Sequence, residues 1–286
     1  MLMSMKDLLA VARVHRFAVP AYNISSSMLL RGALEAAEEA QAPVIIAIHP
    51  DELAFVGTAF VTMALEEARN RSVPVVVHLD HGSSVEQVMG AIRAGFTSVM
   101  IDASELPLEQ NIAACREVTS LAHTVNVSVE GELGTIGELD EEAEAGAEEV
   151  VFVEPDEVKH FVDATDVDTL AVAIGTSHGL YPKDMKPEIR LDLLREISEK
   201  VDIPLVLHGG SGNPDEEIAQ AVELGICKIN ISADMKSAFY LKAREVLQNP
   251  ILREPSSIYP ECIDAMKIVC RQKFDLFSTT GKAALY

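Results

Sequence analysis

Short apolar runs rich in β-branched residues alternate along this chain with segments of helical length. The run Val-Ile-Ile-Ala-Ile at positions 44–48 is apolar throughout, which is typical of a parallel strand buried on both faces. Such alternation of strands and helices predicts repeated β-α units. We assign eight runs to strands: Phe17–Asn23, Val44–Ile48, Val73–His81, Thr97–Ser104, Asn126–Gly134, Thr169–Gly179, Pro204–Gly212 and Cys227–Ser232.

Eight parallel β-α units are the number that closes a barrel. The pattern therefore predicts an α/β fold, a single TIM (β/α)8 barrel spanning residues 1–286 as one domain, because no linker rich in Gly, Pro or Ser divides the chain. A hydrophobic fraction of 48% is enough for one large core. We also expect an N-terminal helix and a C-terminal helical extension, with two short helices between Ile251 and Tyr286.

Polar residues stand at the C-terminal ends of several predicted strands, where barrel enzymes build their active sites. These residues are Asp80, His81, Asp102, Ser104, Glu130, Glu132, His178 and His208. Three imidazoles with one open position are a typical ligand set for catalytic Zn²⁺. We therefore predict that His81, His178 and His208 bind Zn²⁺; the alternative is that each is a buried structural histidine.

The third predicted strand ends with Asp80 directly before His81, and this raises a question of geometry. Adjacent residues of a strand point to opposite faces, so both side chains reach one site only if the strand ends or bends between them. By the same alternation, His78 shares the inner face with Asp80. It would either support a ligand or the carboxylate, or simply fill the barrel.

Glycine and serine residues follow the seventh and eighth predicted strands, at the positions where barrels commonly bind phosphate. The segments read His-Gly-Gly-Ser-Gly at 208–212 and Asn-Ile-Ser-Ala at 230–233. Glycines expose backbone N–H groups, and a helix N-terminus favours an anion without a basic residue. The sequence thus predicts a phosphate site here; the alternative for the first segment is a simple tight turn.

The charge of the chain narrows the range of partners. The formal net charge is -22, from 45 acidic and 23 basic residues, which repels nucleic acids and anionic membrane surfaces. We therefore expect a small-molecule partner and neither nucleic acid nor membrane. Four scattered cysteines without a Cys-x-x-Cys pair, and no visible leader or membrane-length apolar run, predict a reducing cytoplasmic compartment.

Several sequence blocks follow one another in an order that is typical of one enzyme family. They are Lys-Asp-Leu-Leu at 6–9, Phe-Ala-Val-Pro-Ala-Tyr-Asn at 17–23, His-Leu-Asp-His at 78–81, Val-Glu-Gly-Glu-Leu-Gly at 129–134, the run at 170–179 ending in Thr-Ser-His-Gly, and Pro-Leu-Val-Leu-His-Gly-Gly-Ser-Gly at 204–212. In these blocks the chain resembles the class II, zinc-dependent ketose-bisphosphate aldolases, particularly the tagatose-bisphosphate branch. The resemblance implies reversible cleavage of a phosphorylated ketose, such as tagatose or fructose 1,6-bisphosphate, into dihydroxyacetone phosphate and an aldehyde.

The resemblance also implies roles for individual residues. His81, His178 and His208 would hold Zn²⁺, and Asp80 would exchange the proton with the hydroxyl that becomes the aldehyde oxygen. Glu132 would be an alternative metal ligand with Asp102 beside it, unless both carboxylates only support the histidines. A monovalent cation is a further cofactor to consider. The substrate-binding residues would be Asn23, Gly179, Gly209, Gly210, Ser211, Asn230, Ile231, Ser232 and Ala233.

A mobile-loop carboxylate after the fifth strand moves a proton on the dihydroxyacetone phosphate carbon in the resembled family. In this chain the loop is an acidic stretch, from Glu138 to Glu149, without a basic residue, and most of it is expected to be a solvated surface. The family's Gly-Gly before the acid is absent. Alignment favours Asp140 as the catalytic acid, while Glu138 and Glu141 are competitors.

The segment after the second predicted strand also departs from the family. His49 stands where relatives carry serine or threonine, so it either contacts a different aldehyde portion or lies at the rim of the mouth. Candidates for binding a distal phosphate are Lys183, Lys186 and Lys282, none of them within a specific motif. The substrate could therefore also be another ketose 1-phosphate or an acidic sugar derivative.

Two rival interpretations remain open to test. Lys228 on the eighth strand could form a Schiff base in a metal-free aldolase, although a structural ion pair is the simpler expectation. Alternatively, the barrel could be a non-catalytic subunit of an aldolase complex, which the presence of Asp80 and all three histidines argues against. The resemblance suggests a homodimer or homotetramer.

Overall fold

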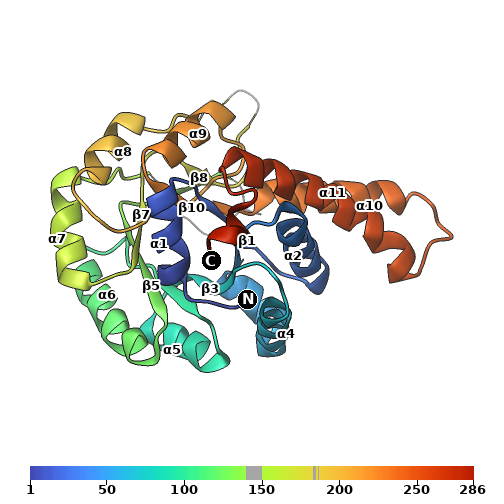
Figure 1. The fold of residues 1–286 in the computed structure, drawn as a ribbon, viewed down its shortest axis with the longest axis horizontal. Helices are drawn as coiled ribbons and strands as arrows, with labels where there is room; N and C mark the ends of the chain where they lie inside the picture. Colours follow the sequence, from blue (N-terminus) through green and yellow to red (C-terminus); the bar gives the residue numbers. More distant parts are fainter. Residues whose placement is uncertain (140–149, 183–184, 186) are drawn as a thin grey trace.

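The computed structural model describes residues 1–139, 150–182, 185 and 187–286. At its centre, parallel strands form a closed barrel in the order β1-β10-β9-β7-β5-β4-β3-β2 (Figure 1). This arrangement confirms the predicted (β/α)8 barrel. The barrel strands are β1 Val19–Asn23, β2 Val44–Ile48, β3 Val75–Gly82, β4 Ser98–Ile101, β5 Ser128–Leu133, β7 Thr169–Val172, β9 Leu205–Leu207 and β10 Ile226–Ile231.

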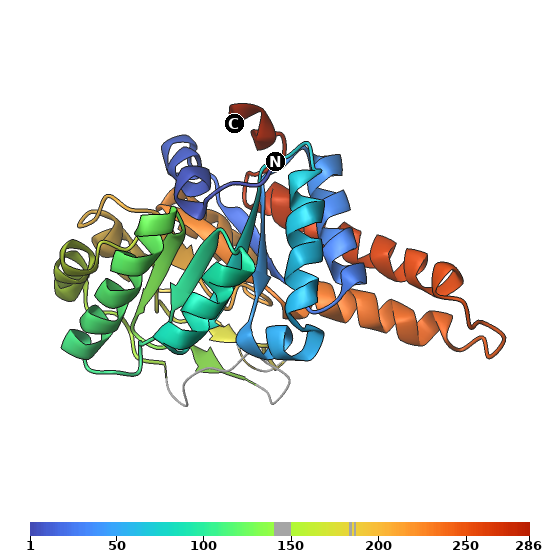
Figure 2. The ribbon, with the colours of Figure 1, turned by 90° about the horizontal axis from the view of Figure 1, so that it is seen from below.

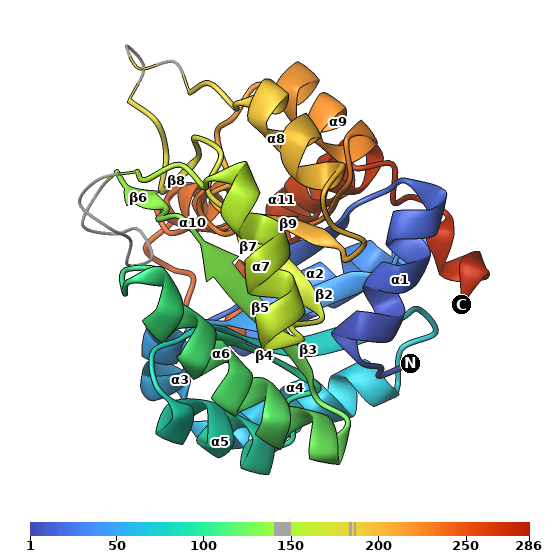
Figure 3. The same ribbon diagram turned by 90° about the vertical axis from the view of Figure 1, so that its left-hand side faces the viewer.

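Helices cover the outside of the barrel, and their apolar faces pack against the strands (Figure 3). Some begin at a serine that caps the helix: Ser26 and Ser84 accept hydrogen bonds from backbone N–H groups of the first turn. The outer helices are α2 Ser27–Ala40, α3 Pro50–Val56, α4 Thr58–Arg69, α5 Val85–Ala94, α6 Leu108–Ala122, α7 Pro155–Thr165, α8 Leu191–Ser198, α9 Asp215–Glu223 and α10 Ala233–Val246, and the short 3-10 helix η1 His123–Val125 follows α6.

The N-terminal helix α1, Met5–His15, closes one end of the barrel. Its buried residues Met5, Leu8 and Leu9 form a cluster with side chains from the barrel interior, including Val76 on β3 and Val19 on β1. Both chain termini lie close to this end, opposite the small sheet β6-β8 (Figure 2). The open mouth of the barrel is therefore the end that carries the C-terminal ends of the strands.

The C-terminal extension differs from the sequence prediction. Instead of two short helices there is one helix of 22 residues, α11 Pro255–Leu276, followed by the 3-10 turn η2 Lys282–Leu285. The helix continues because Cys262, Met266, Cys270 and Phe274 lie four residues apart on one buried face. Together α10 and α11 form a hairpin that projects away from the barrel (Figures 1 and 2).

The sixth predicted strand is two separate elements. The barrel strand β7 ends at Val172, and Ser177–His178 forms β8, which pairs outside the barrel with β6, Gly137–Glu138. The break occurs at Gly175, whose φ of +112° is unfavourable for other residues; a Cβ added there would lie 2.5 Å from the Glu188 carbonyl oxygen. This turn places His178 above the mouth rather than in the barrel wall.

Candidate active site

The three predicted histidines come together at the mouth of the barrel. One ring nitrogen from each of His81, His178 and His208 lies within 4.8 Å of the other two, and all three side chains are buried. The ring centroid of His81 lies 5.1 Å from that of His178 and 4.5 Å from that of His208. The structure thus gathers from three different segments the residues that were proposed as metal ligands.

Carboxylates fix the orientation of two of these rings. His81 donates from Nδ1 to Asp102 Oδ2 at 2.8 Å, and His208 donates from Nε2 to Glu130 Oε1 at 2.8 Å. The remaining nitrogens, His81 Nε2 and His208 Nδ1, are hydrogen-bonded to each other at 2.7 Å, so one proton lies between them. A metal cation that replaced this proton would meet a lone pair from each ring, so the donor set and its supporting carboxylates fit Zn²⁺.

The electrostatic field at this point also favours a positive charge. Burial opposes a charge on His81, but Asp80 and Asp102 outweigh it and raise the pKa of this imidazole to about 10. By contrast, burial and the neighbouring His81 lower the pKa of His208. A site that stabilises a cation despite complete burial is one in which a divalent metal would be electrostatically favoured.

The bend expected between Asp80 and His81 is present. His81 has a φ of +47°, in the left-handed region, and the pairing of β3 with β4 changes register between Leu79 and Gly82. Asp80 consequently stays inside the barrel while the His81 ring turns toward the other two histidines. A left-handed conformation at a non-glycine residue carries strain, which the surrounding hydrogen bonds must offset.

Asp80 is held as a carboxylate by its neighbours. Asn23 and Asn230 each donate from Nδ2 to Asp80 Oδ2, at 2.8 and 2.9 Å, whereas the buried Oδ1 has no hydrogen-bond partner among the described residues. Burial opposes the charge, but His81 and Lys228 outweigh it and keep the pKa of Asp80 well below its usual range. The two amides therefore hold the carboxylate in place through Oδ2, while Oδ1 lies 3.8 Å from His78 Nε2 and 3.9 Å from Lys228 Nζ.

Beneath the histidines, Lys228 forms a buried ion pair with Glu130. Lys228 Nζ lies 2.8 and 2.9 Å from the two Glu130 oxygens and is fully buried. Burial opposes the charge of Glu130, but Lys228 and His208 outweigh it and lower its pKa to about 2. This is the structural ion pair that we expected for Lys228, and it leaves the amine engaged rather than available as a nucleophile.

His78 lies in the same buried layer. Its Nδ1 is 2.8 Å from Ser98 Oγ, and its Nε2 lies 3.8 Å from both Asp80 Oδ1 and Glu130 Oε2. Burial, assisted by Lys228, lowers the pKa of His78 to about 3, so the ring is neutral. His78 is fully buried and its Nε2 has no hydrogen-bond partner among the described residues, so the ring fills the barrel next to the two carboxylates. A supporting role for His78 stays a prediction.

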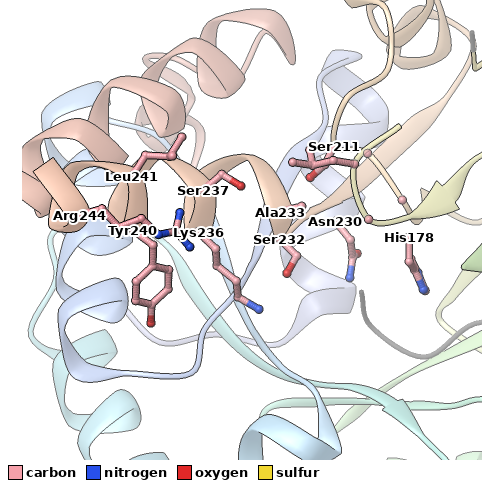
Figure 4. Close-up of a pocket in the computed structure, with 14 residues that line it drawn as sticks. His178, Ser211, Asn230, Ser232, Ala233, Lys236, Ser237, Tyr240, Leu241 and Arg244 are labelled. Atoms are coloured by element: carbon pink, nitrogen blue, oxygen red, sulfur yellow. The ribbon is translucent and has the colours of Figure 1, made fainter. Parts of the chain in front are cut away.

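A cavity of about 690 Å³ extends from the histidines along the start of α10. Gly179, Gly209, Gly210, Ser211, Asn230, Ser232 and Ala233 line it, and Figure 4 shows several of these side chains facing the same space. Gly209 has a φ of +62°, and a Cβ there would lie 2.5 Å from the Ser177 carbonyl oxygen. The residues predicted to bind substrate thus share one cavity, apart from Ile231, which is buried in the barrel core, and Asn23, which contacts Asp80.

Comparison with known proteins identifies the family. The model of a family described as fructose-bisphosphate aldolase class-II matches residues 3–282. The chain belongs to this family. As a class II aldolase, the protein is a carbon–carbon lyase.

Individual relatives cover nearly the whole chain. The 6-phospho-5-dehydro-2-deoxy-D-gluconate aldolase of Bacillus licheniformis is 41% identical over 285 residues, covering 98% of this chain and 96% of its own. The fructose-bisphosphate aldolase of Thermus caldophilus is 37% identical, covering 99% of this chain and 100% of its own. The D-tagatose-1,6-bisphosphate aldolase subunit GatY of Klebsiella oxytoca is 36% identical, covering 98% of this chain and 99% of its own.

Solved structures agree with this placement. The crystal structure of the YdjI aldolase from Escherichia coli K12 superimposes with a TM-score of 0.86 at 31% identity, covering 99% of this chain and 100% of that one. Among the described residues, the aldolase has no helix that is both long and apolar enough to cross a membrane. Its four cysteines are buried and form no disulfide.

Glu132, the predicted alternative ligand, lies close to both His81 and His208, with its Oε2 3.9 Å from His208 Nδ1. Oxygens of Glu132 and Asp102 lie within 4.8 Å of a His81 nitrogen. Burial and the nearby Asp102 raise the pKa of Glu132 well above its usual range, and its Oε2 has no hydrogen-bond partner among the described residues. Asp102 also accepts hydrogen bonds from Ser104, so it both supports His81 and lies within reach of a metal.

Several candidates for the remaining roles lie elsewhere or outside the described residues. Asp140, Glu141, Lys183 and Lys186 belong to segments that the structure does not describe, while Glu138 is an exposed residue of β6. The Lys282 Nζ lies 5.9 Å from the Phe17 ring, at the closed end of the barrel. Lys282 as a ligand for the distal phosphate is therefore wrong, since it lies on the face opposite the mouth.

The cavity along α10 is also lined by side chains that were not predicted from the sequence. Lys236, Tyr240 and Arg244 follow one another at four-residue intervals on α10 and all line this cavity (Figure 4). Lys236 also donates to Glu52 Oε1 at 2.6 Å, which connects α10 to α3. These residues could have been predicted from the sequence, because residues four apart lie on one face of a helix and this helix begins at the predicted phosphate site.

Proposed function

We propose that this aldolase uses Zn²⁺, held by His81, His178 and His208, to cleave reversibly a ketose phosphorylated at C1 into dihydroxyacetone phosphate and an aldehyde. The observation that carries the proposal is the pair of ring nitrogens, His81 Nε2 and His208 Nδ1, which face each other at 2.7 Å while carboxylates engage their opposite nitrogens. When bound, the metal would supply an electrophile that stabilises negative charge on the substrate oxygens.

Asp80 is proposed to act at the bond that breaks. Cleavage between C3 and C4 requires that the C4 hydroxyl lose its proton as its oxygen becomes the aldehyde carbonyl. The ionised Asp80, held in place by Asn23 and Asn230, would accept this proton and return it in the condensation direction. Asn23 and Asn230 then act by orienting the carboxylate as well as by contacting substrate.

The proton on the dihydroxyacetone phosphate carbon requires a second group. We propose a carboxylate at the start of the acidic segment for this step, and Asp140 is the first candidate, with Glu138 and Glu141 as alternatives. Glu138 is the last residue of β6, and the other two follow it in the sequence. Since β6 pairs with β8, and β8 contains His178, the acidic segment begins beside the proposed metal site.

The phosphate end of the substrate is proposed to lie in the cavity at the start of α10. Backbone N–H groups of Gly179, Gly209 and Ala233, with the hydroxyls of Ser211 and Ser232, would bind the anion together with the helix N-terminus, while the Gly210 N–H donates to the Asn230 carbonyl oxygen at 3.0 Å and holds the turn in place. Lys236 and Arg244 add positive charge on the same side. This local arrangement explains how a protein with a net charge of -22 would bind a phosphorylated sugar.

The identity of the ketose is a separate question, because the relatives named above act on different sugars. Tagatose 1,6-bisphosphate and fructose 1,6-bisphosphate are our leading candidates, and a ketose 1-phosphate with an acidic aldehyde end is the alternative. The 41% identity to a phosphodehydrodeoxygluconate aldolase supports including this alternative. A non-catalytic role as a subunit is less consistent with an anchored Asp80 beside three converging histidines.

A homodimer or homotetramer is proposed on the basis of the projecting hairpin. Leu241 and Leu247 near the end of α10, and Ile251 in the turn before α11, are 61%, 53% and 77% exposed. Apolar side chains that are exposed together on one projecting element commonly mark a contact between subunits. Light scattering of the purified protein, compared with a variant carrying Leu241→Lys and Ile251→Lys, would measure the assembly.

One experiment tests the proposed function directly. The zinc-loaded protein would be incubated with each candidate ketose, and dihydroxyacetone phosphate would be measured by a coupled reduction. We expect cleavage of at least one candidate, loss of cleavage in a chelator, and recovery when Zn²⁺ is added back. Cleavage that persists in metal-free protein would contradict the zinc mechanism, and failure to exchange the C3 protons of dihydroxyacetone phosphate in D₂O would contradict the assignment of this half of the substrate.

A further inference from the structure

His49 directly follows β2 and lies at the mouth of the barrel. The residue is only 6% exposed, and its ring centroid is 6.0 Å from that of His81. It lines a second cavity, of about 620 Å³, together with His81, His178, Glu132 and Asp102. His49 therefore faces a space that begins at the proposed metal site.

The backbone of α3 fixes the orientation and protonation of the His49 ring. His49 is the N-cap of this helix: the backbone N–H of Asp51 donates to His49 Nδ1 at 3.2 Å, and the backbone N–H of His49 donates to Glu52 Oε2 at 3.0 Å. A nitrogen that accepts a hydrogen bond carries no proton, so a neutral imidazole must carry its proton on Nε2. Burial, together with His81, lowers the pKa of His49 and favours this neutral form.

The remaining contacts of this segment make it rigid. The other oxygen of Glu52, Oε1, accepts a hydrogen bond from Lys236 Nζ at 2.6 Å, so the start of α3 is joined to the start of α10. No described residue forms a hydrogen bond with His49 Nε2. A donor is thus held in a fixed position beside the cavity, with its second nitrogen already engaged by the helix.

The two cavities lie on different sides of the histidine cluster and share His178 as a lining residue. If the phosphate end of the ketose occupies the first cavity, the carbon chain of the ketose continues past the metal. The fragment released as the aldehyde then extends toward the second cavity. We propose that His49 determines specificity by donating from Nε2 to an oxygen of the aldehyde fragment beyond its carbonyl group. This inference rests on the proposed function and extends it to the aldehyde end.

The donor can be removed without removing the helix cap. In His49→Asn, the side-chain oxygen can replace Nδ1 as acceptor for Asp51, because asparagine is a favoured N-cap residue, while no atom replaces Nε2. Asp51→Asn is the matched control: it removes the carboxylate 3.6 Å from His49 Nδ1 but leaves Nε2 in place. Thermal unfolding of both variants verifies that the barrel is intact.

The test separates the two halves of the reaction in the zinc-loaded enzyme. Exchange of the C3 proton of dihydroxyacetone phosphate in D₂O reports the first half, and condensation with glyceraldehyde or propionaldehyde reports the second. These aldehydes have the same number of carbons, but only glyceraldehyde carries hydroxyl groups beyond the carbonyl. We expect His49→Asn to lower kcat/KM for glyceraldehyde about tenfold, the effect of one lost hydrogen bond, with little change for propionaldehyde or for exchange.

Each other outcome overturns the inference in a recognisable way. Equal losses for both aldehydes, or no loss for either, would show that His49 contacts no oxygen beyond the carbonyl. A loss of proton exchange in His49→Asn would place His49 at the dihydroxyacetone phosphate end instead. An equal loss of kcat/KM for glyceraldehyde in Asp51→Asn would show that the effect arises from charge near His49 and not from the Nε2 donor. Absence of exchange in the unmodified enzyme would instead remove the proposed function on which the inference rests.

Discussion

Glu130 accepts a hydrogen bond from His208 Nε2 at 2.8 Å on the same oxygen, Oε1, that Lys228 Nζ contacts at 2.8 Å. The buried lysine therefore keeps Glu130 ionised, and the ionised Glu130 keeps the His208 proton on Nε2. As a result, His208 Nδ1 presents its lone pair toward His81 and His178. An ion pair inside the barrel thus sets the protonation of a side chain at its mouth.

Glu130→Gln is expected to weaken zinc binding about 10- to 100-fold, the range typical for loss of a carboxylate behind a ligating histidine. The amide still occupies the position, but it no longer favours a proton on His208 Nε2. Competition with a chromophoric zinc chelator would measure the affinity. Glu109→Gln is the control, because Glu109 lies 3.4 Å from His160 on an exposed surface; an equal loss there, or no loss in Glu130→Gln, would contradict the proposed coupling.

Asp80→Asn is expected to lower kcat for cleavage by about 10²- to 10⁴-fold, since an amide cannot accept the proton from the C4 hydroxyl. The substitution preserves the shape of the side chain between Asn23 and Asn230. Zinc content should be unchanged, because Asp80 is not among the proposed ligands. If the variant lost its zinc in parallel with its activity, the effect would belong to the metal site rather than to proton transfer.

The barrel and most of its mouth could be predicted from the sequence because the signals are local. Most strands are short apolar runs with a polar residue at or directly after their end, and this pattern located β2 without error and placed His81 and His208 at strand ends. The bend at His81 was also predictable, since Asp80 and His81 could not otherwise face one site.

The remaining features depend on contacts between distant segments. The split of the sixth run depends on a close approach between Gly175 and Glu188, and the length of α11 depends on its packing along α2 and α10. The capping role of His49 combines a local turn with an ion pair across 184 residues, from Glu52 to Lys236. Patterns within one segment carry no information about partners of this kind.

Lys228 is expected to form no covalent adduct with substrate. Its amine is fully buried and bonded to both oxygens of Glu130, so a carbonyl carbon has no path of approach. Borohydride reduction in the presence of dihydroxyacetone phosphate, followed by intact-mass measurement, should leave the mass of the protein unchanged. A mass increase that disappears in Lys228→Met would instead support Schiff-base chemistry and contradict the zinc mechanism.

Gly209→Ala is expected to disturb the phosphate site and the adjoining turn. The residue has a φ of +62°, and an added Cβ would lie 2.5 Å from the Ser177 oxygen, a backbone atom next to His178 that has little freedom to move. We expect a loss of about 1–3 kcal/mol in the free energy of unfolding, together with a raised KM for the ketose phosphate.

Gly90→Ala provides the matched control for this prediction. Gly90 lies within α5, and a Cβ there would meet no atom within 4 Å, so the same substitution should increase the free energy of unfolding by about 0.5–1 kcal/mol and leave KM unchanged. Urea unfolding and steady-state kinetics of both variants would measure these effects. An unchanged KM in Gly209→Ala would mean that the phosphate does not approach the backbone at this turn, because the displaced N–H groups are those proposed to bind it.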